Sequence, residues 1–314
     1  MKAIKVKLKD AEKVKKILRD NDLSDLRCQV KKIKNFIYFP VKKAVIGYKL
    51  IDIQLELVRE LKEPEGVPAS YDVIGDIIIL REDVKNVKKV AEYLLKKHRY
   101  VKVITQKVGI HSGVYRVQKL KVIAGENRKE TNYKENGIKI KLDVETSYFS
   151  PRLSNERKRI ADLVKLGEKV LVMFSGVAPY PLVIRKHSKA KEIIGIEINP
   201  EAHKYGQENL TLNKMDRITL YQGDVRKVVP TLDLKFDRII MPLPRNAEEF
   251  LDVALKVLKK KGVIHMYTFE EEGKEDRIIK RIQKYTKIKR YKIITVGQFA
   301  PRKLRFCVDF VPEF

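Results

Sequence analysis

The sequence predicts an α/β protein in which a mainly parallel, doubly wound sheet is preceded by two smaller α+β domains. Short apolar segments alternate with helix-compatible segments from residue 146 onward, which is the rhythm of βαβ units. Residues 63–69 contain two prolines and one glycine, a composition typical of a linker. The segment that follows is rich in period-two apolar patterns. We therefore expect domains at 1–62, 70–145 and 146–314.

The first predicted domain combines one helix with several strands. Residues 2–8 alternate lysine with apolar residues, as a half-buried strand does. Apolar side chains three to four positions apart predict a helix over 11–19. Two further apolar segments, at 36–41 and 51–58, predict strands. Together they indicate a small α+β fold.

The second predicted domain contains mostly strands. Residues 73–80 predict a strand that Gly75 interrupts, and residues 82–98 predict an amphipathic helix. Asn136 and Gly137 form a typical hairpin turn. Further strands are expected at 101–104, 115–123, 131–134 and 138–144.

The third predicted domain has the clearest strand pattern. Its strands are short and mostly apolar, as strands buried on both faces are. Each of the first four is followed by a helix-compatible segment, which predicts a parallel sheet. The five strands are expected at 169–174, 192–198, 218–222, 237–241 and 262–268.

The chain is strongly basic along its whole length. It has 68 Lys and Arg residues against 41 Asp and Glu residues, a formal net charge of +27, and residues 1–150 hold 34 and 20 of these. Such a field attracts polyanions and predicts nucleic-acid binding. The alternative is a lysine-rich proteome of a heat-loving organism, but glutamate usually rises together with lysine in such proteomes and does not do so here.

Several other classes of protein do not fit the sequence. Cys28 and Cys307 form no Cys-x-x-Cys pair and the five histidines show no metal-ligand spacing, so we expect neither a disulfide framework nor a metal site. No apolar segment reaches the roughly 18 residues of a membrane span, and residues 1–10 lack the apolar core of a signal peptide. We expect a cytoplasmic monomer without an obligate protein partner.

The candidate site lies after the strands of the third domain, because ligands of such sheets bind beyond the carboxyl ends of the strands. The loop after the first strand contains Phe174, Ser175 and Gly176. With a single glycine it matches neither the Gly-x-Gly-x-x-Gly dinucleotide pattern nor a phosphate-binding Gly-Lys-Ser/Thr loop. It therefore permits close approach of a ligand without offering a pyrophosphate site.

Acidic residues end the second and third strands. Glu197 lies 21 positions after Gly176, where a carboxylate holds a ribose diol, and Asp224 is placed to accept from an adenine amino group. Glu197 could instead cap a helix, and Asp224 could be a turn residue. The ordered set favours an adenosine-bearing cofactor without phosphates, a description that S-adenosylmethionine fits. The neighbouring candidates for cofactor contact are Ile198, Asn199 and Val225.

Six longer motifs stand out besides these strand ends. They are Ser-Tyr-Asp-Val-Ile-Gly-Asp at 70–76, Tyr-Arg-Val at 115–117, Ala-Gly-Glu-Asn-Arg at 124–128, Tyr-Lys-Glu-Asn-Gly at 133–137, Tyr-Phe-Ser-Pro-Arg-Leu at 148–153 and Glu-Arg at 156–157. Together they resemble a single family, the archaeal and eukaryotic tRNA (guanosine-37 N1)-methyltransferases, with the strongest likeness from residue 73 to about 309. The resemblance implies a class I, Rossmann-like methyltransferase domain and S-adenosylmethionine as cofactor.

Two motifs depart from the usual family pattern. Residues 172–181 read Val-Met-Phe-Ser-Gly-Val-Ala-Pro-Tyr-Pro where the family has an Asp-Met-Phe-Ala-Gly-Val-Gly-Pro-Phe type, and Pro242 stands where Asn is expected. This version resembles the archaeal subgroup linked to wyosine synthesis. The resemblance therefore implies methylation of guanosine 37 at N1, together with methylation of demethylwyosine at carbon 7, which forms isowyosine.

The resemblance also assigns roles to single residues. Guanine N1 carries a proton at neutral pH, so a general base is needed, and Glu156 matches the family's base. Arg116 matches the arginine that stabilises negative charge growing on the guanine O6. By position alone, Glu156 would be a first-turn helix acid and Arg116 an exposed strand charge. Pro242 would alter the orientation of the base, and further contacts to cofactor and base are expected from Tyr148, Ser150 and Arg152.

The predicted partner is tRNA, whose target base in the anticodon loop must leave its stack. Arg128 and Arg157 are candidates for phosphate contacts besides Arg116 and Arg152, and the N-terminal domain would check tRNA shape elsewhere. Three alternatives stay open. They are a carbon-7 methyltransferase without guanosine activity, a non-catalytic RNA-binding protein with a decayed methyltransferase fold, and a small-molecule methyltransferase.

Overall fold

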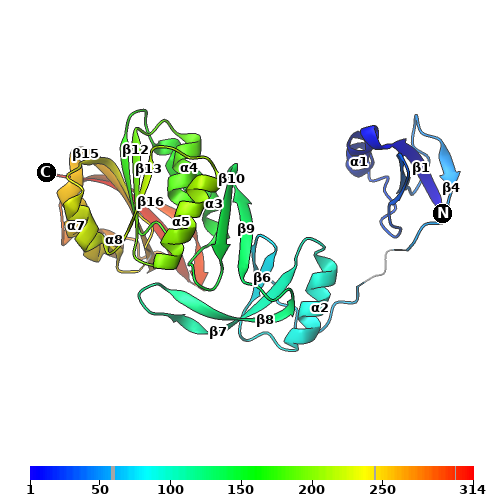
Figure 1. Ribbon diagram of the computed structural model, residues 1–314, viewed down its shortest axis with the longest axis horizontal. Coiled ribbons are helices and arrows are strands. Elements are labelled where there is room, and N and C mark those ends of the chain that lie inside the picture. Colours follow the sequence, from blue (N-terminus) through cyan, green and yellow to red (C-terminus); the bar gives the residue numbers. More distant parts are fainter. Residues whose placement is uncertain (58–60, 244, 301) are drawn as a thin grey trace. The chain divides into compact units, whose positions relative to one another are not determined.

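The computed structural model describes residues 1–57, 61–243, 245–300 and 302–314, without the side chains of residues 110–112. The chain divides into two compact units, Met1–Glu63 and Pro64–Phe314. Figure 1 labels their helices and strands.

The N-terminal unit is an antiparallel sheet with one helix. The sheet has the order β2-β3-β1-β4, and helix α1 packs Val14 and Leu18 into its core. The elements are β1 (Lys2–Lys7), the 3-10 turn η1 (Leu8–Asp10), α1 (Ala11–Asp20), β2 (Lys31–Ile33), β3 (Phe36–Pro40) and β4 (Leu50–Asp52).

One strand prediction in this unit was wrong in extent. The strand expected at 51–58 ends at Asp52, and of the residues after it only Leu57 forms an isolated bridge, to Cys28. Residue 58 lies outside the described residues. The short strand β2 was missed because its three residues are all exposed, so no burial pattern marks them.

A four-stranded sheet follows the linker, with the order β5-β6-β7-β8. The predicted interruption at Gly75 is a reversal of the chain, because β5 and β6 pair antiparallel. Gly75 has φ +59°, and a Cβ there would lie 2.1 Å from the Thr131 hydroxyl, so only glycine fits. The elements are β5 (Asp72–Ile74), β6 (Ile77–Leu80), α2 (Val87–Lys97), β7 (Val103–Ser112) and β8 (Val117–Gly125).

Helix α2 begins five residues later than expected. Asn86 adopts a left-handed backbone with φ +50° and starts the helix at Val87, so residues 82–86 are not helical. The periodic apolar pattern before it reflects packing of Val84 against the same core rather than helical structure.

The predicted Asn136-Gly137 hairpin is confirmed. Both residues have positive φ, 45° and 73°, as a type I′ turn requires, and they join β9 (Glu130–Glu135) to β10 (Ile138–Asp143). Strand β10 contributes Ile138, Ile140 and Leu142 to the core cluster beneath the C-terminal sheet. The hairpin follows the β5–β8 sheet in the sequence, but it packs on the helices of the C-terminal sheet.

The C-terminal sheet confirms the predicted α/β architecture. Its order is β13-β12-β11-β14-β15-β17-β16; the first five strands are parallel, and β17 and β16 are antiparallel additions. The strands are β11 (Lys169–Met173), β12 (Glu192–Glu197), β13 (Ile218–Gln222), β14 (Phe236–Met241), β15 (Leu258–Glu271), β16 (Ile288–Ala300) and β17 (Lys303–Pro312).

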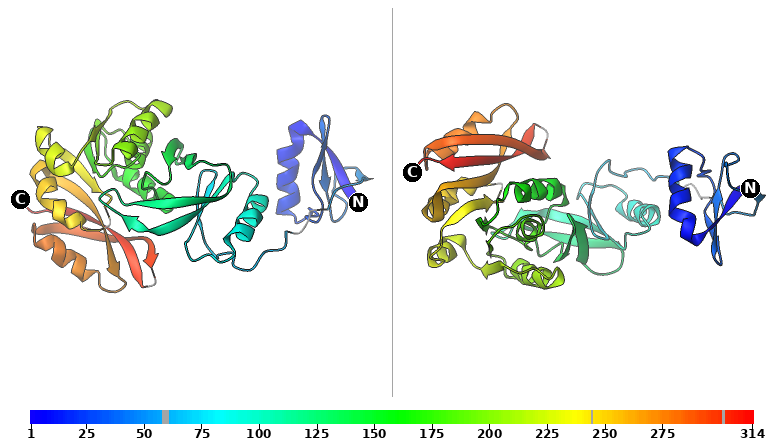
Figure 2. Two further views of the ribbon diagram at one scale, coloured as in Figure 1. Left: turned by 60° about the horizontal axis from the view of Figure 1, so that its bottom comes forward. Right: turned by 90° about the horizontal axis from the view of Figure 1, so that it is seen from above.

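Helices cover both faces of this sheet (Figure 2). Val170 and Val172 of β11 pack with α3, α4 and α5, while Leu171 and Met173 pack with α6, α7 and α8. This alternation is the period-two pattern of a strand buried on both sides. The helices are α3 (Ser154–Leu163), α4 (Pro179–His187), α5 (Pro200–Leu212), α6 (Val225–Val228), α7 (Leu251–Val257) and α8 (Asp276–Gln283), with 3-10 turns η2 (Pro151–Leu153), η3 (Val229–Thr231) and η4 (Ala247–Phe250).

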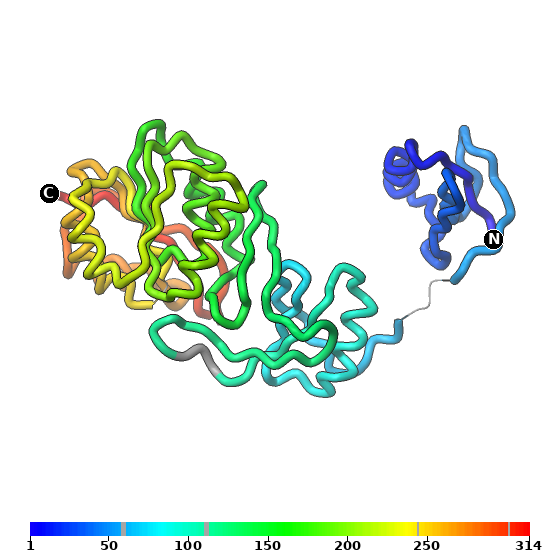
Figure 3. The backbone as a smooth tube through the Cα atoms, in the orientation of Figure 1, coloured from blue at the N-terminus to red at the C-terminus, as the bar shows by residue number. Residues whose placement is uncertain are grey.

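The final hairpin was not predicted. Strands β16 and β17 form the orange-to-red end of the chain in Figure 3. Most of β16 is exposed or half-buried, so its sequence lacks the apolar alternation that marks the other strands. None of the described helices is long and apolar enough to cross a membrane.

Candidate active site

A pocket opens beyond the carboxyl ends of β11, β12 and β14. Its far wall comes from residues 114–116, in the turn between β7 and β8, so two distant parts of the chain enclose it. Eight of the ten predicted cofactor residues line it: Tyr148, Ser150, Phe174, Ser175, Gly176, Glu197, Ile198 and Asn199.

The loop after β11 shapes the floor of this pocket. Phe174, Gly176 and Ala178 all have positive φ, and Pro179 then begins α4. The Ser175 side chain is buried, and its hydroxyl has no hydrogen-bond partner among the described residues. A buried hydroxyl without a partner costs free energy, so it fits a site that a polar ligand completes.

Glu197 presents a carboxylate that the backbone holds in place. Its Oε2 accepts from the Gly176 N–H at 2.6 Å, and its Oε1 accepts from the Asn199 N–H at 2.8 Å. Burial raises the pKa of Glu197, and these amide hydrogen bonds oppose the rise. A carboxylate offers about four lone-pair sites, so Glu197 keeps acceptor capacity for ribose hydroxyls besides its backbone partners.

The alternative role of Glu197 as a helix cap does not agree with the structure. Asn199 caps α5, since its side-chain oxygen accepts from the Glu201 and Ala202 amides. The residues at this strand end therefore fit the ribose of an adenosine-bearing cofactor, and the loop after β11 offers no phosphate site.

Asp224 and Val225 are the two predicted cofactor residues that do not line the pocket. Asp224 caps the short helix α6, accepting from the Arg226 N–H at 2.8 Å. Val225 is buried in the core on the other face of the sheet. The Gly223 N–H donates to the Glu197 carbonyl, which joins the ends of β13 and β12. Asp224 therefore follows the neighbouring strand and not the strand whose end bears Glu197. Its contact with an adenine remains a prediction.

Replacing Glu197 with Ala is expected to weaken S-adenosylmethionine binding about 100-fold, because two hydrogen bonds to a charged acceptor are lost. Isothermal titration calorimetry measures the dissociation constant. Glu201→Ala is the matched control, since Glu201 is an exposed acid four positions later and does not line the pocket. Equal affinity of the Glu197 variant and the control would contradict the assignment.

Arg116 and Pro242 both line the pocket. Arg116 has φ +53° at the end of the β7–β8 turn, and its Nη2 donates to the Arg245 carbonyl at 3.1 Å. Burial lowers the pKa of Arg116, and the nearby charge of Arg245 lowers it further. A guanidinium held between a pocket and a second cation gains from any negative charge that develops in the pocket.

Glu156 is buried in the first turn of α3 and does not itself line the pocket. Both its oxygens accept from Arg159 at 2.7 Å, and Oε1 also accepts from the Tyr267 hydroxyl at 2.5 Å. Two neighbours of Glu156 in the sequence do line the pocket, namely Leu153 one turn before it and Arg157 directly after it. Glu156 thus lies behind the residues that line the pocket, and its carboxylate accepts a hydrogen bond from Tyr267 of β15.

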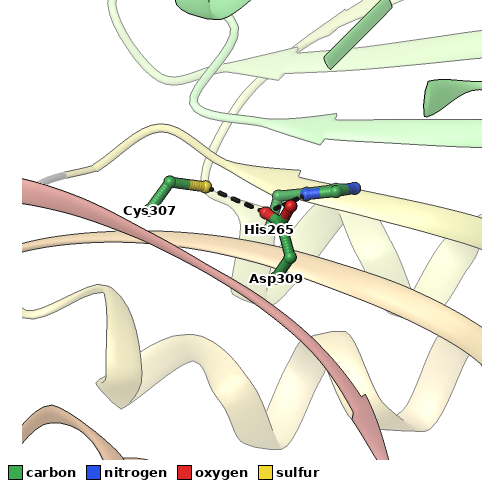
Figure 4. Close-up of side chains that lie close together, drawn as sticks. All are labelled: His265, Cys307 and Asp309. Carbon is green, nitrogen blue, oxygen red and sulfur yellow. Dashed lines mark hydrogen bonds and ion pairs between the residues drawn. The ribbon is translucent and has the colours of Figure 1, made fainter. Parts of the chain in front are cut away.

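Arg159 connects Glu156 to a buried polar cluster on β15 and β17. Figure 4 shows three members of this cluster, His265, Cys307 and Asp309. His265 Nδ1 lies 2.5 Å from Asp309, and its Nε2 lies 2.6 Å from Arg238. Burial lowers the pKa of His265 although Asp309 opposes this, so the imidazole is neutral and donates Nδ1–H to the carboxylate.

This cluster has the residue types of a metal site but not its electrostatics. Ligand atoms of His265, Cys307 and Asp309 lie within 4.8 Å of one another. The guanidinium groups of Arg159 and Arg238 contact the same atoms and repel a cation. The cluster therefore fastens α3 to the sheet. Sequence spacing could not reveal it, because the pairing of β15 with β17 brings the residues together.

The predicted RNA-contacting arginines lie in different surroundings. Arg157 is 1% exposed and donates to both oxygens of Glu135 at 2.5 Å, so a phosphate contact by Arg157 does not agree with its placement. Arg128 is paired with Asp76 and Glu126 and is about one-third exposed. Arg152 is largely exposed, although it pairs with an aspartate at 2.8 Å.

Several residues of the pocket were missed in the sequence. They are apolar or aromatic and lie next to predicted residues, so residue type alone gave no signal of ligand contact. They are Val114, Tyr115, Phe149, Leu153, Pro179, Tyr180, Ala202 and Leu243.

Family models match nearly the whole chain. The model described as the TRM5/TYW2 methyltransferase domain matches residues 131–294, and that of the TYW2 N-terminal domain matches residues 54–128. The model of the tRNA methyltransferase 5 N-terminal domain matches residues 3–49.

Individual relatives agree with these matches. The tRNA (guanine(37)-N(1))-methyltransferase Trm5b of Pyrococcus abyssi is 36% identical and covers 99% of both chains. The tRNA (guanine(37)-N(1))/4-demethylwyosine(37)-methyltransferase Taw22 of Nanoarchaeum equitans is 37% identical over 76% of this chain and 98% of its own.

Two solved structures have the same fold. The complex of aTrm5 with tRNALeu has a TM-score of 0.72 at 32% identity, covering 98% of both chains. TYW2 of Methanocaldococcus jannaschii in complex with AdoMet has a TM-score of 0.60 at 28% identity, covering 77% of this chain and 98% of its own. With one family model spanning residues 131–294 and a relative 36% identical over 99% of its length, the chain belongs to the TRM5/TYW2 family of methyltransferases.

Proposed function

We propose that this protein transfers the methyl group of S-adenosylmethionine to N1 of guanosine 37 in tRNA. The observation that carries the proposal is the extent of the likeness to Trm5b, which includes the N-terminal unit. The likeness to Taw22 spans nearly all of that protein but only 76% of this chain. Taw22 is named for both guanosine N1 and demethylwyosine methylation, whereas two relatives that match nearly the whole chain, Trm5b of Pyrococcus abyssi and of Methanocaldococcus jannaschii, are named for guanosine N1 methylation alone.

Two pocket residues, Glu197 and Arg116, divide the chemical work with Glu156, which lies behind the pocket lining. S-adenosylmethionine supplies an electrophilic methyl group when bound. Glu197 holds the ribose, and Glu156 removes the N1 proton, for which its carboxylate must exchange a hydrogen bond from Arg159 or Tyr267 for one from the guanine. Arg116 stabilises the negative charge that then grows on O6.

The proposed substrate and site of transfer are tested directly. Purified protein is incubated with labelled S-adenosylmethionine and unmodified tRNA transcripts that carry guanosine or adenosine at position 37, and the methylated nucleoside is mapped. Methyl on N1 of guanosine 37 alone supports the proposal. No transfer to either transcript, with cofactor binding intact, would overturn it and leave demethylwyosine as the substrate.

Methylation of carbon 7 of demethylwyosine is a second candidate activity. Pro242 lines the pocket, and a proline cannot supply the side-chain hydrogen bonds that an asparagine would direct at a guanine. We infer that this leaves room for the tricyclic base. Pro242→Asn is then expected to lower the rate on demethylwyosine-containing tRNA about tenfold relative to guanosine-containing tRNA. An unchanged ratio of kcat/KM values for the two tRNAs would refute this role.

The remaining proposals concern the protein as a whole. We propose that it acts in the cytoplasm as a monomer on the anticodon loop of tRNA. The carboxylates of Glu197 and Glu156, each held by hydrogen bonds, and the pocket that Glu197 lines count against a decayed, non-catalytic fold. A requirement for folded tRNA would exclude a small-molecule substrate.

A further inference from the structure

A second, larger cleft adjoins the cofactor pocket. It shares five lining residues with that pocket and has a volume of about 710 Å³, within the range of ligand sites. Its walls come from the β5–β8 sheet on one side and the β16–β17 hairpin on the other. The shared residues are Arg116, Tyr148, Phe149, Ser150 and Leu153.

Phe299 and Arg305 line the cleft from the hairpin, and two further side chains that do not line it, Phe269 of β15 and Arg245 after β14, continue a row of arginine and aromatic residues. The Arg305 guanidinium lies 5.2 Å from the Phe269 ring centroid, and the Phe269 and Phe299 centroids are 4.1 Å apart. Arg245 follows at 5.7 Å from the Phe299 ring. Phe299 is 47% exposed although it is a large apolar residue. We call these four residues the stacking row.

The two arginines of the stacking row differ from the buried arginines of the protein in their partners. No carboxylate forms an ion pair with Arg245 or Arg305 among the described residues, whereas the buried Arg157 and Arg238 each pair with a glutamate. The Arg305 Nε is buried and has no hydrogen-bond partner among the described residues. The Arg305 Nη2 donates to the Tyr148 hydroxyl at 3.4 Å, which leaves its charge without a counter-ion among the described residues. Guanidinium groups of this kind beside an exposed ring suit a ligand with both negative charge and flat aromatic surfaces.

We propose that the stacking row binds the nucleotide next to the target base. Phe299 would stack on its base, and Arg245 and Arg305 would contact the flanking phosphates. The base-stacking face lies beside the pocket that receives the target base, because Arg116 lines both cavities and donates to the Arg245 carbonyl. The proposal rests on the proposed action on tRNA and adds the residues that hold the RNA strand once the target base has left its stack.

Phe299→Ala is expected to weaken tRNA binding about tenfold, since stacking of one base on an aromatic side chain contributes that much or more. Tyr291→Ala is the matched control, because Tyr291 is an equally exposed aromatic on β16 that does not line the cleft. Affinity is measured by filter binding with full-length protein and tRNA transcripts. S-adenosylmethionine binding by both variants should stay unchanged, which excludes general misfolding.

An RNA-side change separates stacking from other effects. Two transcripts are compared, one with an abasic nucleotide at position 36 and one with an abasic nucleotide at position 38. For one of the two, the Phe299→Ala variant and the wild type should bind equally well, because the base that stacks on Phe299 is missing. Arg245→Ala should reduce the dependence of binding on salt by about one phosphate contact, and Arg290→Ala, an exposed arginine on β16, should not.

The possible outcomes distinguish the two proposals. Phe299→Ala and Tyr291→Ala variants that bind every transcript alike would overturn the stacking row. A tenfold loss for the Phe299 variant alone, with the effect removed by one abasic position, supports it. This result would stand even if mapping placed the methyl group elsewhere than N1, in which case only the proposed function fails.

Discussion

Glu156→Gln is expected to lower kcat for N1 methylation about 10²- to 10⁴-fold, because the amide cannot accept the guanine proton. The amide has nearly the shape of the carboxylate and can still accept from the Tyr267 hydroxyl, so the fold should survive. Single-turnover assays with saturating S-adenosylmethionine measure the methylation step itself.

Two further variants separate catalysis from structure at Glu156. Asp162→Asn removes an exposed carboxylate from the same helix, which pairs with Lys158, and should retain full activity. Tyr267→Phe removes one hydrogen bond to Glu156 but leaves its carboxylate, so activity should fall far less than for Glu156→Gln. Comparable losses for the Tyr267 and Glu156 variants, with lowered unfolding midpoints in both, would assign Glu156 a structural role.

The parts of the fold that sequence predicts are those where local pattern and burial agree. Strand β13 was predicted at its observed bounds, and the Asn136-Gly137 turn was predicted because type I′ geometry nearly requires those residues. Strand β16 was missed because its exposed surface carries no pattern, and its position depends on pairing with β17. A strand that is positioned only by pairing with a distant segment has no local sequence pattern from which it can be predicted.

The same distinction applies to the candidate site. Glu197 could be predicted because ligands of open α/β sheets bind beyond the carboxyl ends of the parallel strands. The burial of Arg157 could not be predicted, since an arginine after a helix start is exposed in most proteins. Its partner Glu135 lies 22 positions earlier, at the end of β9, and only the packing of the hairpin on α3 and α4 brings them together.

The ion pair of Arg157 and Glu135 carries the largest expected effect on stability. Their side chains are 2% and 1% exposed, and the guanidinium also contacts the Phe149 and Tyr180 rings at 5.1 and 6.0 Å. Glu135→Ala should lower the free energy of unfolding by about 3–5 kcal/mol, because a buried cation is left without its partner. Urea unfolding followed by circular dichroism measures the change.

Two comparisons identify the cause of that loss. Glu130→Ala removes an acid at the other end of β9 that is 45% exposed and pairs with Lys141, so it should cost under about 1 kcal/mol. The double change Glu135→Leu with Arg157→Met removes both charges and should restore most of the stability. Because Arg157 also lines the cofactor pocket, the restored variant should still bind S-adenosylmethionine more weakly than the wild type. A double variant as unstable as Glu135→Ala would show that packing volume, and not the unpaired charge, sets the loss.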